Sequence, residues 1–183
     1  MILDTATELF AELGYDATST NAIAARAGMS PGSLYQFFSN KEDIAEGLAA
    51  RFVPQLAAAH AAATAPDLAD VSMDELIDRI VDPIVAVNVE NPGMKEVFGR
   101  ADMPASVTAP ARRVQGAVLE RIASVIQQRL PDLDGTSLRY ATTVLRLFAT
   151  FVPLVVSAEP ADREMLVAEF KTVLRGYLEQ IQA

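Results

Sequence analysis

A chain of 183 residues with 51% hydrophobic and 21% charged residues can bury a core, and it has the composition of a folded globular protein rather than a disordered one. The net charge of −9 argues against a protein that coats nucleic acid without specificity, but it does not exclude a site-specific reader, because local charge decides such contacts. Cysteine is absent, which excludes a disulfide framework and fits a cytoplasmic protein.

The first part of the chain predicts three short helices. Residues 2–13 carry apolar side chains at the spacing of an amphipathic helix. Ser19 can cap a second helix, and Gly28 can end it, because glycine readily adopts the left-handed conformation. Ser30 can cap a third helix with Pro31 at its first position. Two helices around a glycine-containing turn form the helix-turn-helix layout, whose second helix can enter a DNA major groove.

The distribution of charge over this layout is uneven. Within Ser19–Lys41 the charged residues are Arg26 and Lys41, both basic. The acidic residues of the first 47 positions all lie outside this stretch: Asp4, Glu8, Glu12, Asp16, Glu42, Asp43 and Glu46. The face expected to approach DNA is therefore clear of acid, which is what contact with a phosphate backbone requires.

A long helix follows. Ser39 and Glu42 have the spacing of a capping box, which predicts that the helix opens here. The helix includes Pro54, where we expect a bend, and continues into the alanine-rich stretch 57–65, because alanine is the strongest helix former. Residues Pro66–Val71 predict a loop.

The middle of the chain predicts a second capped helix that contains a proline. Ser72–Glu75 form a second capping-box pattern, followed by apolar residues at helical spacing with Pro83 as an expected kink. Asn91–Gly93 are turn-forming residues that end this helix, and a short helix follows and ends near Arg100.

The last third predicts three helices, over 105–130, over 136–157 and from Pro160 onward. The helix over 136–157 is apolar almost all round from Val144, so it must be buried by its own core or by another subunit. Its uncharged run, Leu147–Ala158, is too short to span a bilayer, and we expect no signal peptide. With no strand pattern, the chain is predicted to be all-α with about nine helices.

Residues Gly14–Ile44 resemble the DNA-binding domain of the TetR-type family of helix-turn-helix transcriptional regulators. About the first 47 residues are covered by this motif, and the remainder agrees in length and helical layout. The residues that carry the resemblance are Gly14-Tyr15, Thr18-Ser19, Ile23-Ala24, Ala27-Gly28, Ser30, Gly32, Leu34-Tyr35, Phe38 and Asn40-Lys41-Glu42.

The resemblance implies a helix-turn-helix DNA-binding domain over residues 1–47, with its recognition unit at 19–38, and a helical ligand-binding and dimerisation domain over 48–183. It implies contacts with double-stranded operator DNA, with Lys41 on a phosphate. The residues to which it assigns these contacts are Ser19, Thr20, Asn21, Pro31, Gly32, Ser33, Tyr35, Gln36 and Lys41. Many family members have a basic residue where Asn21 stands and an aromatic residue or His where Gln36 or Phe37 stands, so the operator sequence is not inferable.

The resemblance also implies a ligand-responsive homodimeric repressor, which a largely apolar small-molecule effector releases from a palindromic operator. The two recognition helices of such a dimer lie about 34–36 Å apart. The dimer interface is expected on the last two helices, at Leu147, Val155, Phe170, Leu174, Tyr177, Leu178 and Ile181. The effector pocket is expected among Phe52, His60, Met94, Phe98, Arg100, Met103, Phe148 and Phe151, with Arg100 as a candidate anchor for an anionic group.

Catalytic and metal chemistry find little support. There is one histidine, no cysteine, no phosphate-cradling glycine loop and no nucleophile elbow, so we expect no enzyme activity, no cofactor and no metal. Asp74, Glu75 and Asp78 fit a solvated acidic face near a helix N-terminus better than a metal site. His60, as a lone histidine in an alanine tract, is either a helix-surface residue or a polar group of the ligand pocket.

Two alternatives stay open. TetR-type proteins usually carry a basic arm before the first helix, and here that helix begins at the first residue. Either a natural N-terminal extension precedes this sequence, which we favour, or DNA binding is weaker than is usual for the family. The second possibility gives an alternative function, a helical small-molecule-binding or interaction protein with a vestigial DNA-binding domain. The effector, the regulated genes and the choice between repressor and activator are not readable from the sequence.

Overall fold

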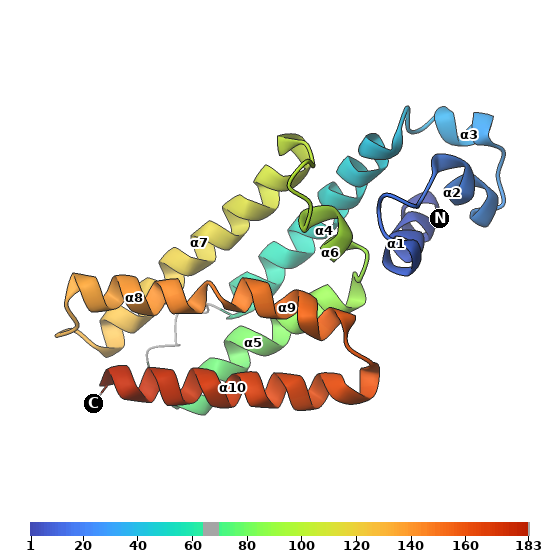
Figure 1. Cartoon of the computed structure of the whole chain (residues 1–183). Helices are drawn as coiled ribbons and strands as arrows, with labels where there is room; N and C mark the ends of the chain where they lie inside the picture. The colour runs from blue at the N-terminus through green and yellow to red at the C-terminus, as the bar shows by residue number, and fades with distance from the viewer. Residues whose placement is uncertain (64–69, 183) are drawn as a thin grey trace. The chain divides into compact units, whose positions relative to one another are not determined.

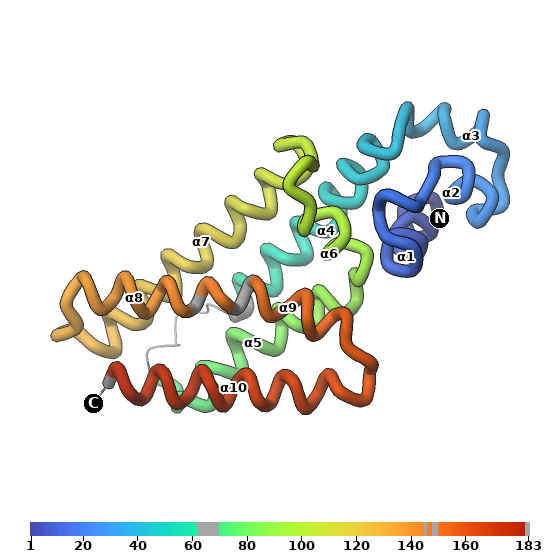
Figure 2. Tube along the Cα trace, in the orientation of Figure 1, coloured from blue at the N-terminus to red at the C-terminus, as the bar shows by residue number. Residues whose placement is uncertain are grey.

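A computed structural model describes residues 1–63 and 70–182, except for the side chains of residues 62, 63, 145, 148, 149 and 182. Over these ranges the chain forms ten helices and no strand, so the predicted all-α fold is confirmed (Figures 1 and 2). The loop predicted at Pro66–Val71 falls mostly outside the described residues. The helices are α1 (Ile2–Leu13), α2 (Thr20–Arg26), α3 (Pro31–Tyr35), α4 (Lys41–Ala63), α5 (Met73–Glu90), α6 (Met94–Phe98), α7 (Ala105–Arg129), α8 (Gly135–Leu145), α9 (Phe148–Ser157) and α10 (Pro160–Gln182).

The tenth helix arises because the segment predicted as one helix over 136–157 is interrupted after Leu145. Just before the interruption, the hydroxyl groups of Thr142 and Thr143 donate to main-chain carbonyls of the preceding turn at 2.7–3.0 Å. Such hydroxyl-to-carbonyl bonds compete with the helical ladder and bend helices. The apolar pattern runs on through this point, so it gave no sign of the break.

The predicted helix caps are confirmed at three places, including Ser72, whose hydroxyl accepts from the N–H of Glu75 at 3.2 Å, and the cap is shifted at a fourth. The hydroxyl groups of Ser19 and Ser30 cap α2 and α3, each accepting a backbone N–H three residues on at 3.1 Å. The box predicted at Ser39 and Glu42 is wrong by one residue. The side chain of Asn40 accepts from the N–H of Asp43 at 2.7 Å, and the Asp43 carboxylate accepts from the N–H of Ser39 at 2.9 Å. Asn and Ser cap equally well, so the residue types alone could not decide between them.

Main-chain proximity divides the chain into two compact units. Unit 1 consists of Met1–Leu56 and Glu90–Arg113, so it joins the three N-terminal helices to the first part of α4, to α6 and to the start of α7. Its core contains fully buried Phe10, Ile23 and Leu34. The division of function at residue 47 stays a prediction, because a compact unit need not coincide with a functional domain.

One close approach within unit 1 fixes α6 against α1. Gly93 lies directly before α6, and a Cβ atom at this position would stand 2.4 Å from the main-chain oxygen of Thr7, in the middle of α1. Only a residue without a side chain lets the two backbones come this close. At a second glycine, Gly47 of α4, the neighbours are side chains instead: a Cβ there would stand 3.1 Å from the ring of Phe38 and 3.2 Å from Leu3 of α1.

Unit 2 consists of Ala57–Val89 and Val114–Ala183. Its main core joins α5, α7, α8 and α10 through buried Ile77, Val81, Ile122, Ile126, Ala141, Leu174 and Leu178. A smaller cluster of Ile84, Val152 and Val156 attaches α9 to α5. Among the described residues, no helix is both long and apolar enough to cross a membrane.

Candidate DNA interface and effector region

The two helices of the recognition unit are tied together by side chains that are also expected at DNA. The hydroxyl groups of Thr20 on α2 and Tyr35 on α3 lie 3.0 Å apart and join the two helices, whereas those of Ser30 and Ser33 lie 2.9 Å apart within the start of α3. Ile23 and Leu34 are fully buried beneath them. Each helix therefore buries an apolar side chain, and the Thr20–Tyr35 pair holds polar side chains of both helices together at the surface.

The predicted DNA contacts gather on the accessible side of this unit. Ser19, Asn21, Pro31, Gly32, Tyr35 and Gln36 are exposed, and Thr20 and Ser33 are half-buried. These neutral groups can donate to phosphates or meet base edges. The contacts themselves stay a prediction.

Phe37 is a residue of this surface that the sequence reasoning did not assign. Its side chain is 69% exposed, directly after Tyr35 and Gln36. The sequence did hold the signal, because Leu34 and Phe38 have the i, i+4 spacing of the inward face and Phe37 does not.

Both basic side chains of Ser19–Lys41 have partners within the protein. The guanidinium of Arg26 binds both carboxylate oxygens of Glu12 at 2.9 and 3.1 Å, and it holds the pKa of Glu12 below its usual value. The ammonium of Lys41 donates to the main-chain oxygens of Tyr15, Asp16 and Thr18 at 2.7, 3.3 and 2.9 Å.

The buried ring of Tyr15 is the centre of a charged cluster in unit 1. The Lys41 ammonium lies 4.3 Å from the ring centroid and the Arg100 guanidinium 5.2 Å from it. Burial, followed by the charge of Glu42, raises the pKa of the Tyr15 hydroxyl to about 12, so this group stays neutral. Lys41 is the first residue of α4 and Arg100 follows α6, so the cluster joins the start of α4 and the end of α6 to the loop after α1.

Arg100, expected to anchor an anionic effector, already binds two carboxylates. Its guanidinium donates to Asp102 at 2.8 and 2.6 Å and to Asp16 at 2.6 Å. These bonds raise the pKa of Arg100 further above its ordinary value, so the charge is permanent but neutralised nearby. The structure thus gives Arg100 a link between the α6–α7 connector and the α1–α2 loop, and an effector contact stays a prediction.

The other predicted pocket residues fall in both units. In unit 1, Phe52, Met94 and Met103 are buried, and the rings of Phe52 and Phe98 lie 5.6 Å apart. In unit 2, His60 is buried, and Phe151 stacks on Phe170 with centroids 4.1 Å apart. The side chain of Phe148 lies outside the described residues. The structure therefore brings Phe52 and Phe98 together, and it places His60 and Phe151 in another unit.

Burial of His60 predicts acid sensitivity. Its imidazole is 7% exposed, and desolvation lowers its pKa from 6.5 to about 4. The folded state then binds fewer protons than the unfolded state between these two values, so stability present above pH 6.5 is lost as the pH falls toward 4. At pH 5 we expect a loss of about 1–2 kcal/mol relative to pH 7. Urea unfolding of the wild type and of His60→Leu at both pH values checks this. Because His60 is the sole histidine, equal pH dependence in the two proteins would contradict it.

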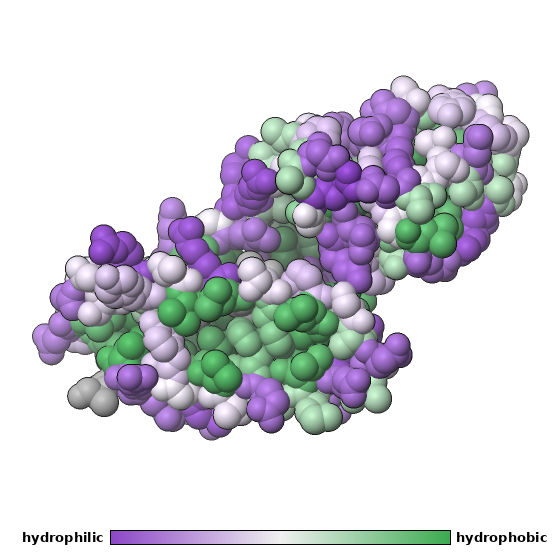
Figure 3. All heavy atoms as spheres, in the orientation of Figure 1, coloured by the Kyte–Doolittle hydropathy of each residue, from purple (hydrophilic) through white to green (hydrophobic). Residues whose placement is uncertain are grey.

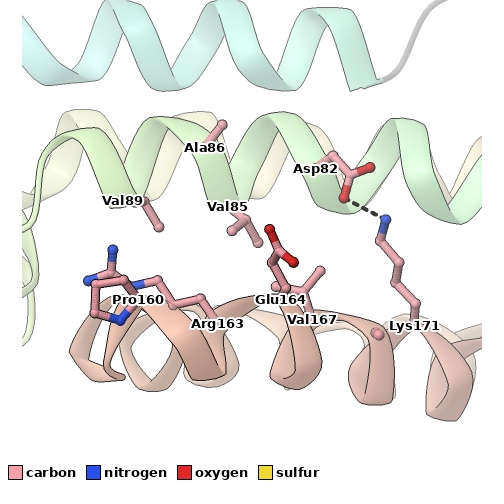
Figure 4. A pocket seen from close by; sticks show the side chains of 10 residues that line it. Asp82, Val85, Ala86, Val89, Pro160, Arg163, Glu164, Val167 and Lys171 are labelled. Carbon is pink, nitrogen blue, oxygen red and sulfur yellow. Dashed lines mark ion pairs between the residues drawn. The ribbon is translucent and has the colours of Figure 1, made fainter.

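An open groove within unit 2 lies between α5 and α10 (Figure 4). It encloses about 510 Å³ and contains none of the predicted pocket residues. Valines from both helices form its apolar part, while Arg163, Glu164 and the ion pair between Lys171 and Asp82 (2.6 Å) give it charges of both signs. The volume suits a small molecule, but the open shape and the mixed charge select no chemical class.

The predicted dimer residues differ in their exposure within one chain, and their contact with a second subunit stays a prediction. Val155, Leu174 and Leu178 are 0–7% exposed within a single chain, and Leu174 and Leu178 belong to the main core of unit 2. Leu147 is 60% exposed, while Phe170, Tyr177 and Ile181 are half-buried. Apolar side chains gather over α9 and α10 on the face seen in Figure 3. The large exposed ones on these helices are Leu154, Met165, Leu166 and Val173.

Comparison with known proteins assigns both parts of the chain. Residues 2–48 match the model of bacterial regulatory proteins of the tetR family, and residues 72–178 match the tetracyclin repressor-like C-terminal domain. Among curated proteins, the fatty acid metabolism regulator protein of Bacillus subtilis is 46% identical over 43 residues, which are 24% of this chain and 22% of that protein. The chain thus matches only about a fifth of the length of this relative.

Solved structures match over nearly the whole chain. A TetR-family regulatory protein from Rhodococcus RHA1 has a TM-score of 0.73 at 21% identity, covering 97% of this chain and 94% of the other. PfmR from Thermus thermophilus has a TM-score of 0.68 at 20% identity, with 98% and 96% covered. FadR from Bacillus subtilis, solved in complex with stearoyl-CoA, has a TM-score of 0.64 at 18% identity, with 97% and 95% covered. At these identities the likeness establishes the fold. With family models matching over most of its length, the chain belongs to the TetR family of DNA-binding transcriptional regulators.

Proposed function

We propose that this regulator is a homodimeric repressor, which acts in the cytoplasm on a palindromic operator and leaves it when a small-molecule effector binds. The observation that carries the proposal is the surface of α2 and α3, where hydrogen-bonding side chains are exposed and the hydroxyl groups of Thr20 and Tyr35 join the two helices. Such preorganised neutral groups suit contact with phosphates and base edges.

Dimerisation is supported by the apolar surface of the last two helices. Leu154 on α9 and Val173 on α10 are 65% and 67% exposed, and a two-fold dimer buries the same patch twice. We expect Leu154→Glu to weaken the dimer more than tenfold, because it places two carboxylates in an apolar contact. Sedimentation over a concentration series measures this. Leu13→Glu, at a 52% exposed leucine of α1, is the control and should leave the dimer intact. A wild-type monomer at micromolar concentration would contradict the proposal.

The effector acts by shifting a population between two arrangements of the paired DNA-binding domains. It releases DNA only to the extent that it binds the low-affinity arrangement better. Helix α4 begins at Lys41, near the end of the predicted DNA-binding domain, and continues into unit 2, so it can transmit a change from one to the other. Because FadR of Bacillus subtilis was solved with stearoyl-CoA, we choose this compound as the first probe for a thermal-shift screen.

Selection of duplex DNA from a random pool tests the DNA-binding part. We expect enrichment of a palindrome, and a gel-shift complex that unlabelled palindrome displaces and scrambled DNA does not. If no sequence is enriched even after any upstream arm is restored, the repressor proposal fails.

A second candidate, a ligand-binding or interaction protein with a vestigial DNA-binding domain, is favoured by one observation. The first 47 residues contain seven acidic and two basic residues, and both basic side chains are engaged within the protein. Under this alternative the random pool yields no enriched sequence, while the thermal-shift screen still finds a ligand.

A further inference from the structure

We propose that Lys41 is a positioning residue of the DNA-binding domain, which holds the loop between α1 and α2 on the start of α4, and that its ammonium makes no phosphate contact. The inference rests on the proposed operator binding, but it reverses the role that the family resemblance implies for this residue.

The geometry around the ammonium leaves no proton for DNA. A lysine ammonium has three N–H donors, and here three main-chain oxygens accept from it, those of Tyr15, Asp16 and Thr18. The ring of Tyr15 lies 4.3 Å from the same nitrogen and supplies a cation–π contact. A phosphate would have to displace at least one of these partners. Loss of the donor is costly for the carbonyls of Tyr15 and Thr18, whose bonds are partly buried, while the bond to Asp16 is exposed and longer.

The charges around Lys41 also disfavour the binding of a phosphate at this position. The next two residues are Glu42 and Asp43, in the first turn of α4. The N–H of Asp43 is already bound by the side chain of Asn40. The helix N-terminus is therefore partly capped from within and carries two carboxylates, which repel phosphate at short range.

The loop held by Lys41 sets the position of α2. Thr18 donates its hydroxyl to the main-chain oxygens of Gly14 and Leu9 at 2.8 and 3.2 Å, and the next residue, Ser19, caps α2. On the other side of the loop, Asp16 is bound by Arg100. Loss of the Lys41 clamp would free the three carbonyls that precede Ser19, and with them the orientation of Thr20 and of its partner Tyr35.

Salt dependence of operator affinity separates the two roles. Each phosphate neutralised by a cationic side chain adds about 0.9 to the slope of log K against log salt, so a phosphate-binding Lys41 would contribute about 1.8 in a dimer. We expect Lys41→Met to weaken operator binding at least tenfold with the slope unchanged. We expect Lys41→Gln to keep part of the affinity, because its amide donates two hydrogen bonds. Gln36→Arg, on the exposed surface of the recognition unit, calibrates the assay by steepening the slope.

Hydrogen exchange of the free protein gives a second measurement that needs no DNA. In Lys41→Gln, the amides of residues 15–19 are expected to exchange at least tenfold faster, while those of α5 and α10 in unit 2 keep their rates. A slope reduced by about 1.8 in Lys41→Met overturns the inference. Unchanged exchange in the loop also overturns it. If wild-type protein selects no operator, the proposed function fails, and the exchange experiment alone decides the role of Lys41.

Discussion

Replacement of Gly93 by alanine is expected to lower the free energy of unfolding by about 3 kcal/mol. The backbone of Gly93 is helical, with φ −67° and ψ −17°, so alanine meets no conformational barrier. The cost is steric, because the added methyl group would stand 2.4 Å from the main-chain oxygen of Thr7 and 3.1 Å from its carbonyl carbon. These atoms are part of the α1 ladder, so they cannot move aside without moving the helix. Urea unfolding with an unchanged m value measures the loss.

Gly116→Ala is the matched control. Gly116 lies inside α7, and nothing stands within 4 Å of a Cβ built at this position. Alanine has a higher helix propensity than glycine, so this variant should be more stable than the wild type by up to about 1 kcal/mol. If Gly93→Ala were also as stable as the wild type, the close approach of α6 to α1 would be wrong.

Replacement of Tyr35 by alanine is expected to weaken operator binding about a hundredfold and to change stability little. The side chain is 48% exposed, so little apolar burial is lost. The variant removes a predicted DNA contact and also frees the Thr20 hydroxyl, which lies 3.0 Å from the Tyr35 hydroxyl. In a dimer the loss occurs at both half-sites, and about 1.4 kcal/mol at each gives the hundredfold effect. Titration of the selected operator followed by fluorescence anisotropy measures it.

Three further variants separate the contributions of the Tyr35 ring and of its hydroxyl to operator affinity. Leu13→Ala removes a similarly exposed apolar side chain of the same unit and should leave operator affinity within about twofold. Tyr35→Phe keeps the ring and loses the hydroxyl, and combined with Thr20→Val it isolates the coupling of the two hydroxyl groups in a double-mutant cycle. Additive effects in this cycle would mean that the bridge between α2 and α3 does not contribute to recognition.

Local signals in the sequence predicted the recognition unit well. Ser19 and Ser30 cap α2 and α3 as expected, and Gly28 adopts the left-handed conformation with φ +69°. Each of these features depends on neighbours within a few residues. The shifted cap at Asn40 shows the limit of such reasoning, since adjacent Ser and Asn have equal preference for the position.

Features that depend on distant residues were not predictable. Arg100 binds Asp16, which is 84 residues away, and Lys41 binds carbonyl groups that no side-chain pattern marks. The apolar pattern of the last two helices predicts that their surface is buried, but it does not predict whether the same chain or a second subunit buries it. Val155 and Leu174 are buried within one chain, and the same apolar pattern also suits a subunit contact, so the pattern alone does not decide between the two.

The discontinuity of unit 1 has a consequence for engineering. The chain leaves this unit after Leu56 and returns at Glu90, and the returning segment brings Gly93 and Arg100 to the first helix and its loop. In a chimera that joins only the N-terminal domain to the C-terminal domain of another regulator, residues of that regulator would replace Gly93 and Arg100 as neighbours of α1 and Asp16. Transplants that carry residues 90–102 along with 1–56 should therefore fold and switch where the shorter graft does not.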